Sequence, residues 1–352
     1  LRGPLLVGPG TDVAEAWVVG GRLTFDRPSL PTTALEGWVL PGLADAHCHV
    51  GLGPDGAVPR EVAEEQALTD RAAGALLLRD AGQPGDTRWI DERPDLPVVV
   101  RAGRHIARSR RYLRGFGVEI EPDALVEEVR RQAAAGDGWV KLVGDWIDRD
   151  RGDLAPCWPL EVLQPAIAAA HEAGARVTAH CFGEDCLPDL VTAGIDCVEH
   201  ATGLTDATVG SLAAQGIAIV PTLVNIATFP EIASAARDKF PRYAEHMQAL
   251  HARRYETVAL AHEAGVPVYA GTDAGGSLAH GRVADEVREL HAAGLSRTAA
   301  LTAATWGARA WLGRDGLVEG AQADLVVYPA DPRLDLGVLA APTHVVLRGR
   351  VV

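Results

Sequence analysis

Four histidines and one aspartate have the side-chain types and the positions to bind a metal ion. His47 and His49 end the apolar segment PGLADAHCHV, His180 ends ARVTAH, His200 ends DCVEH, and Asp273 lies in VYAGTDAGG. Imidazole and carboxylate are standard ligands of Zn²⁺ and similar divalent ions. Side chains two positions apart share one face of a strand, so both imidazoles of the HxH segment can reach the same ion. We therefore predict a site for a divalent metal, with zinc as the expected ion.

One type of junction recurs along the chain: a helix-like segment ends in glycine, and a short apolar run follows. Glycine suits a helix C-terminus because it tolerates the left-handed conformation there. Short apolar runs are typical of parallel strands that are buried on both faces. Two further apolar runs, near residues 40 and 98, bring the predicted strands to eight. The junctions are Gly74, Gly136, Gly174, Gly194, Gly216 and Gly265.

Strands that alternate with helices form right-handed βαβ units, and eight such units most naturally close into a barrel. We predict an α/β fold with a (β/α)₈ TIM-type barrel over residues 40–315. Each candidate ligand lies at or just past the C-terminal end of a predicted strand, where barrel enzymes place their catalytic groups. A final helix is expected from Ser296 to Leu312, with Ser296 as its N-cap.

The two ends of the chain, residues 1–39 and 316–352, read as short strands and turns with little helix. Neither end could bury a core by itself. We therefore expect them to pair into one small β domain beside the barrel.

Composition excludes some function classes. The net charge of −14 argues against a nucleic-acid partner, which would require a basic face. No run approaches the ~18 apolar residues that a membrane span needs, so no membrane role is expected. Five cysteines without a CxxC pair indicate reduced, buried thiols and a cytoplasmic protein. The chain begins with leucine instead of methionine, which leaves a trimmed leader open.

The segments that carry these residues closely resemble the amidohydrolase superfamily, in family order and over almost the whole chain. They are PGLADAHCH, LLLRDAG, WVKLV, VTAH, VEH, GTDAGG, ALTAATWGARAWLG and GAQADLVVY. The resemblance implies a distorted barrel, with the terminal segments folded together as a small β-sandwich. It also implies hydrolysis of a C–N or similar bond by a metal-bound hydroxide.

By the same resemblance, His47, His49 and Asp273 would hold the more buried metal, and His180 and His200 the more exposed one. The catalytic set would be Asp273, Lys141 and His200, with Asp273 as the shuttle that passes a proton to the departing nitrogen.

Lys141 bears on the number of metal ions. It lies in WVKLVGD within the fourth predicted strand, and burial there would lower the pKa of its amine. A neutral amine can take up CO₂ to form a carbamate, N6-carboxylysine, which is able to bridge two divalent ions. The prolidase-like branch of the superfamily carries such a lysine, although that branch typically has Gly-Gly shortly after it, where this chain has Gly144-Asp145. The alternative is a salt-bridged or snorkelling lysine in a one-metal enzyme.

Three functions are compared. The leading prediction is a binuclear hydrolase of an amide or peptide bond in a small molecule, such as a dipeptide or an N-acyl amino acid. The second is a one-metal hydrolase of a cyclic amide, like imidazolonepropionase, and the third is a non-catalytic metal-binding scaffold. A deaminase is disfavoured because Gly183 stands where that branch usually carries a glutamate. Oligomeric state is left open, with a homo-oligomer among the expectations.

Candidates for substrate contact are less well defined by the sequence. Arginines crowd the segment after the third strand, where guanidinium could bind a substrate carboxylate, and a solvated loop explains them equally well. The long loop GDWIDRDRGDLAPCW could form a lid, with Trp158 as a second candidate wall. The candidates are Arg104, Arg111, Tyr112, Trp146, Thr222, Asn225 and His280.

Overall fold

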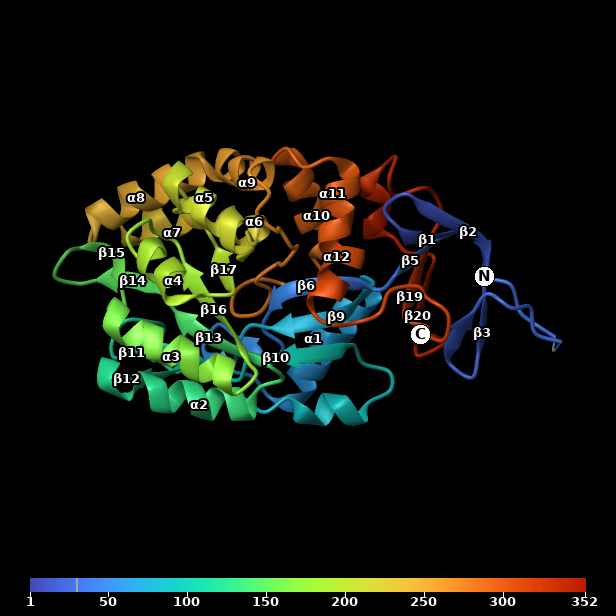
Figure 1. The fold of residues 1–352 in the computed structure, drawn as a ribbon, viewed down its shortest axis with the longest axis horizontal. Helices are drawn as coiled ribbons and strands as arrows, with labels where there is room; N and C mark the ends of the chain where they lie inside the picture. Colours follow the sequence, from blue (N-terminus) through green and yellow to red (C-terminus); the bar gives the residue numbers. More distant parts are fainter. Residues whose placement is uncertain (30) are drawn as a thin grey trace.

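The computed structural model describes residues 1–29 and 31–352, and its largest part is a ring of parallel strands surrounded by helices (Figure 1). The barrel strands are short, mostly apolar and mostly buried, as the glycine-bounded runs predicted. The barrel strands are β6 (Leu43–Cys48), β9 (Ala75–Asp80), β10 (Val98–Arg101) continued by β11 (His105–Arg108), β13 (Trp139–Val143), β16 (Arg176–Cys181), β17 (Cys197–His200), β18 (Ala218–Val220) and the extended segment 266–270.

Hydrogen bonds run around the whole ring. One group of neighbours is β10-β9-β6, and the other continues from β11 through β13, β16 and β17 to β18. The extended segment 266–270 links the two groups: Val268 pairs with Ile219 in parallel, and the amide of Ala46 donates to the carbonyl of Ala270 at 2.8 Å. The predicted (β/α)₈ barrel is confirmed, and its C-terminal strand ends share one face of the molecule.

Helices cover the outside of the barrel, and three more lie beyond its C-terminal end after β18. The outer helices are α1 (Arg60–Ala72), α2 (Leu125–Ala135), α3 (Leu160–Glu172), α4 (Leu187–Ala193), α5 (Asp206–Gln215), α9 (Arg254–Glu263), α10 (Val283–Ala292), α11 (Arg297–Ala304) and α12 (Trp306–Trp311). The other three are α6 (Leu223–Ile226), α7 (Phe229–Ala236) and α8 (Pro241–Ala252), and the 3₁₀ turns are η1 (Arg88–Glu92), η2 (Pro122–Ala124) and η3 (Leu336–Ala340).

Five of the six junction glycines adopt positive φ, as a helix end requires, and Gly136 does not. Its backbone is extended, with φ −84° and ψ −175°. A Cβ there would lie 2.7 Å from the carbonyl oxygen of Trp139 and 2.9 Å from that of Arg101. Gly136 is therefore needed for a close approach of backbone segments, and its predicted left-handed conformation is wrong.

The two ends of the chain fold together into one antiparallel-rich sheet at one end of the molecule (Figure 1). Its strand order is β2-β1-β5-β19-β20-β21, so a strand from residues 38–41 lies between the N-terminal and C-terminal parts. A hairpin packs beside this sheet. The strands are β1 (Arg2–Gly8), β2 (Thr11–Glu15), β5 (Trp38–Pro41), β19 (Leu325–Tyr328), β20 (His344–Leu347) and β21 (Arg350–Val351), with β3 (Trp17–Val19) and β4 (Arg22–Thr24) in the hairpin.

The final helix is capped as predicted but is not continuous. The Ser296 hydroxyl oxygen accepts from the amide of Ala299 at 3.1 Å. The helix breaks at Thr305, whose φ of −129° and ψ of −109° are not helical. After the break, the indole of Trp306 donates to the carbonyl of Leu6 at 2.9 Å, which ties α12 to the terminal sheet. The single helix expected from Ser296 to Leu312 is therefore wrong.

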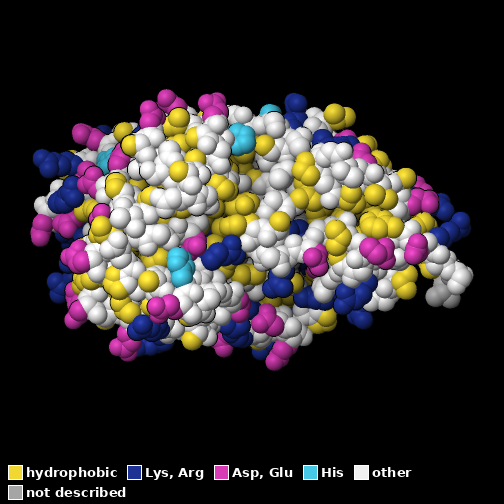
Figure 2. Space-filling view, in the orientation of Figure 1, with side chains coloured by type: hydrophobic (Ala, Val, Ile, Leu, Met, Phe, Trp, Pro, Cys, Tyr) yellow, Lys and Arg dark blue, Asp and Glu magenta, His cyan; other side chains and the backbone are white. Residues whose placement is uncertain are grey.

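Short hairpins and strands lie among the loops at the C-terminal face of the barrel. They are β7 (Leu52–Gly53), β8 (Gly56–Ala57), β12 (Gly117–Ile120), β14 (Asp145–Asp148) and β15 (Asp153–Pro156). All five cysteines are buried and free. Across the described residues, every helix is too short or too polar to cross a bilayer. Acidic and basic side chains are interspersed on the face drawn in Figure 2, so this face carries no extended basic surface.

Candidate metal centre

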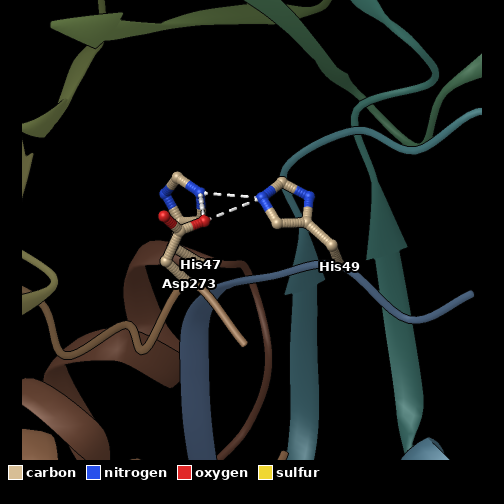
Figure 3. Close-up of side chains that lie close together, drawn as sticks. All are labelled: His47, His49 and Asp273. Atoms are coloured by element: carbon tan, nitrogen blue, oxygen red, sulfur yellow. Dashed lines mark hydrogen bonds and ion pairs between the residues drawn. The ribbon is translucent and has the colours of Figure 1, made fainter. Parts of the chain in front are cut away.

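Three of the five predicted ligands meet at the mouth of the barrel. Nε2 of His47 lies 3.1 Å from Nε2 of His49. Oδ1 of Asp273 lies 3.0 Å from the first nitrogen and 2.9 Å from the second (Figure 3). His47 is the penultimate residue of strand β6 and His49 directly follows the end of that strand, whereas Asp273 comes from the loop after residue 270. The chain thus brings together ligands separated by more than two hundred positions.

In His47 and His49, Nδ1 contacts a hydrogen-bond acceptor, and this contact determines which ring nitrogen carries the proton. Nδ1 of His47 lies 2.6 Å from a carboxylate oxygen of Glu199, and Nδ1 of His49 lies 2.6 Å from the carbonyl oxygen of Gly82. Each Nδ1 therefore donates, and in the neutral ring each Nε2 presents a lone pair. Two nitrogen lone pairs and a carboxylate oxygen converge, which is a donor set that fits a divalent cation.

Hydrogen bonds to strand β6 fix the position of Asp273. Its backbone lies in the left-handed region at φ 59°, and its amide donates to the carbonyl of His47 at 2.7 Å. The preceding residue, Thr272, donates its amide and its hydroxyl to the two oxygens of Asp45, at 3.0 and 2.6 Å. Burial would raise the pKa of Asp273, but His47 and His49 outweigh it and hold the pKa well below its usual range. The carboxylate is therefore ionised and aimed at the histidines.

His180 and His200 line the same cavity beside this trio. The ring centroids of His47 and His200 are 5.1 Å apart, and those of His200 and His180 are 4.7 Å apart. Nε2 of His180 is buried and has no hydrogen-bond partner. Burial lowers the pKa of His200 to about 3 and that of His180 well below its ordinary value, so both rings are neutral and able to bind a metal.

Lys141 lies in the middle of strand β13 and also lines this cavity. Its side chain is 1% exposed, and its Nζ has no hydrogen-bond partner. Burial lowers the pKa of this amine, although Glu199 and Asp273 oppose the effect. An unpartnered buried ammonium is unfavourable. The geometry therefore fits a lysine that is neutral or chemically modified.

A buried ion pair beneath the histidines was missed by the sequence reasoning. Glu199 is fully buried, and its second carboxylate oxygen accepts from the guanidinium of Arg79 at 2.7 Å. Arg79 also donates to the carbonyl of Ala46 at 2.6 Å. Burial would raise the pKa of Glu199, but Arg79 and His47 hold it well below its usual range. The available signal was two charged residues, Arg79 and Glu199, inside apolar strands.

A cavity of about 620 Å³ opens above the histidines. Of the predicted substrate contacts, Tyr112, Trp146 and Asn225 line it. The amide of Asn225 donates to Oδ2 of Asp273 at 2.6 Å. His105, which was not predicted, also lines the cavity, and its buried Nδ1 has no partner. Its position in the continuation of the third strand was the signal that could have identified it.

Other predicted contacts lie elsewhere. Arg104 lines a separate cavity. The hydroxyl of Thr222 forms a hydrogen bond with Nδ1 of His200 at 2.7 Å. His280 pairs with Asp70 of α1 at 2.8 Å. Trp158 is buried in the core, with its indole donating to the carbonyl of Val143 at 2.8 Å. These side chains do not line the cavity above the histidines.

Arg111 holds the β14–β15 hairpin instead of facing the cavity. Its guanidinium contacts a carboxylate oxygen of Asp148 at 2.9 Å and donates to the carbonyls of Trp146 and Ala155 at 2.9 and 2.8 Å. All of these partners belong to the hairpin. Both terminal nitrogens of the guanidinium are therefore bonded within the hairpin, its buried Nε has no hydrogen-bond partner, and the side chain does not line the cavity.

Comparisons with known proteins identify the family of this chain. The model of the amidohydrolase family matches residues 38–352. Uncharacterized proteins of Mycobacterium tuberculosis and Mycobacterium bovis are 56% identical over 344 residues, covering 97% of this chain and 93% of each relative.

Solved structures with the same fold include a Xaa-Pro dipeptidase with bound methionine, at 21% identity and TM-score 0.84, covering 100% of this chain and 98% of that one. A putative prolidase from Bifidobacterium longum has 23% identity and TM-score 0.83, covering 100% and 93%. An A. niger ochratoxinase has 21% identity and TM-score 0.80, covering 99% and 94%. At these identities the likeness shows the fold. With the family match over most of its length, the chain belongs to the amidohydrolase family and is a hydrolase.

Proposed function

We propose that this protein is a metal-dependent hydrolase that cleaves an amide or other C–N bond of a small molecule. The observation that carries the proposal is the convergence of Nε2 of His47, Nε2 of His49 and Oδ1 of Asp273, which lie within 3.1 Å of one another. His180, His200 and Lys141 line the same cavity and would complete the ligand set. A bound divalent ion, with zinc as the expected one, lowers the pKa of water and polarises a carbonyl group.

Asp273 would accept the proton of the attacking water and pass it on. Oδ1 of Asp273 faces the two histidines, while Oδ2 accepts from Asn225. A carboxylate held in this way can take a proton from the attacking water and deliver it to the departing nitrogen. Thr222 keeps the ring of His200 turned toward the cavity. Glu199 does the same for His47.

As a carbamate, Lys141 would help to hold two ions. Its buried, unpartnered amine supports this role, because a neutral amine is the form that reacts with CO₂. One observation favours a second candidate, a one-metal hydrolase of a cyclic amide. Among the predicted ligands in the described part of the chain, His47, His49 and Asp273 form the one group of three or more whose donor atoms all lie within 4.8 Å of one another.

Metal analysis separates the two candidates and tests the proposal. The full chain is stripped with a chelator, reloaded with zinc in ¹³C-bicarbonate buffer, and assayed on a panel of amides. We expect about two ions per chain, a ¹³C carbamate signal that is absent from Lys141→Ala, and amide hydrolysis that depends on metal. One ion without a carbamate signal would favour the cyclic-amide candidate. Tight zinc binding without hydrolysis of linear or cyclic amides would refute both.

A further inference from the structure

Aromatic rings lie directly against two of the candidate ligands, His180 and His200. The ring of Phe182 lies 4.2 Å from that of His180 and 4.9 Å from that of His200, between centroids. The ring centroid of Trp146 lies 5.3 Å from that of His180 and 4.7 Å from that of Tyr112. A group attached next to the reacting carbon would therefore meet aromatic faces and edges first. Such surfaces favour apolar and aromatic partners.

The mouth of the cavity is apolar as well. Leu113 and Ile232 line it and remain 46% and 36% exposed, respectively. Large exposed apolar side chains at the rim of a concave site mark a ligand-binding surface more often than they occur by accident. Phe240 and Tyr243 of the α7–α8 region continue the wall inward. The apolar lining therefore extends from the mouth to the ligands.

Cationic groups are scarce in this cavity. Among the described residues that line it, the cations other than histidine are Lys141 and Lys239. Lys141 lies within the ligand set. Lys239 is exposed in the turn between α7 and α8, with its Nζ 5.3 Å from the ring centroid of Phe240. Arg111, the predicted carboxylate anchor, is bonded to its own hairpin. A carboxylate beside the scissile bond would thus be buried among aromatic rings without a cationic side chain, which is unfavourable.

We infer that the site selects amides that carry a bulky, uncharged aromatic group, and that it disfavours substrates with a carboxylate next to the scissile bond, such as dipeptides. The cavity of about 620 Å³ has room for a two-ring aromatic group together with the amide. This inference rests on the proposed function for the cleavage itself. The selectivity rests on the lining of the cavity.

Three matched compounds test the selectivity on the zinc-loaded full chain. N-(2-naphthoyl)glycinamide and N-(2-naphthoyl)glycine differ in the carboxylate alone, and N-acetylglycinamide lacks the aromatic group. We expect kcat/KM for naphthoylglycinamide to exceed that for naphthoylglycine at least about 10-fold, because the carboxylate has no partner. The excess over acetylglycinamide should be about 100-fold, from the additional apolar surface buried. Equal or faster cleavage of naphthoylglycine, or of acetylglycinamide, would overturn the inference.

A binding measurement separates this inference from the proposed function. Calorimetric titration of the zinc-loaded chain with 2-naphthamide requires no turnover. Leu113→Asp places a charge at the cavity mouth. It should weaken binding at least about 5-fold, because an apolar ligand would remove water from the new carboxylate without offering it a hydrogen bond. Leu334→Asp, at a residue that is 75% exposed and outside the cavity, is the matched control and should leave binding within 2-fold.

Each pattern of failure has its own meaning. Binding of 2-naphthamide that depends on Leu113, without hydrolysis of any amide, would refute the proposed function and support the selectivity. Hydrolysis of small dipeptides, with no binding of 2-naphthamide, would refute the selectivity and leave the hydrolase. Equal effects of the two Asp variants would also overturn the selectivity.

Discussion

Replacing Glu199 by glutamine should both destabilise the fold and weaken metal binding. Glu199 and Arg79 form an ion pair at 2.7 Å, and both side chains are fully buried. The other carboxylate oxygen of Glu199 accepts from Nδ1 of His47 at 2.6 Å. Glutamine has nearly the same shape, but it lacks the charge and turns an N–H group toward side chains that donate to the carboxylate, namely His47, Arg79 and Thr178. Arg79 would remain as a buried charge without its counterion.

The magnitude follows from the burial of the pair. Removing one partner of a buried ion pair destabilises a protein by about 3–5 kcal/mol. That is a large part of the ~5–15 kcal/mol that separates folded from unfolded chains. Removing the residue that orients a histidine ligand lowers metal affinity about 10- to 100-fold. We therefore expect a loss of at least about 3 kcal/mol in unfolding free energy and a drop of at least about 10-fold in zinc affinity.

Urea unfolding in chelator measures the first effect without the contribution of bound metal. Competition with a fluorescent zinc chelator measures the second effect. Glu127→Gln is the matched control, because Glu127 is 82% exposed and pairs with Arg131 at the surface, where such pairs contribute about 0–1 kcal/mol. If Glu199→Gln unfolds within about 1 kcal/mol of the native chain and binds zinc equally well, the ion pair does not support the site as described.

Three further predictions concern the site and its surroundings. Asp273→Asn should keep most of the bound metal and lose at least about 100-fold in kcat, because the proton acceptor is removed; native-like turnover with metal bound would exclude the shuttle role. His246 contacts Asp153 and Glu184 at 3.0 and 2.9 Å, and these contacts raise its pKa from 6.5 to about 9. The charge of His246 should therefore stabilise the fold fully below pH 6.5, and this stabilisation should be lost as the pH rises through about 9. The difference in unfolding free energy between the native chain and His246→Gln should shrink over the same pH range. A pH-independent difference would contradict this assignment. Arg111→Gln should lower the unfolding free energy by about 1–3 kcal/mol, because the contacts to the hairpin are lost. It should change kcat/KM equally for charged and uncharged amides. A loss of kcat/KM confined to substrates with a carboxylate would instead show that Arg111 binds the substrate carboxylate.

Local sequence patterns were sufficient to place the barrel and to locate the candidate ligands at the ends of its strands. A parallel strand buried on both faces must be apolar, and a helix that returns to it ends most easily at glycine, so both signals are written in neighbouring residues. His47, His49, His180 and His200 could be identified because each interrupts such an apolar run at its C-terminal end. Lys141 was identified for the same reason, as a charge inside a buried strand.

Contacts between distant segments were decided only by the tertiary structure. Arg79 and Glu199 form a pair across the barrel, and Asp45 positions Asp273 through Thr272, although 227 positions separate Asp45 from Thr272. No local pattern specifies such partners, because their energies depend on burial and direction rather than on spacing. The same holds for Arg111, whose guanidinium has the same chemistry in a substrate site and in a hairpin clamp. Local residue order determined the strands, their ends and the types of the candidate ligands. Packing in three dimensions decided which polar groups face the cavity and which bond to partners within the fold.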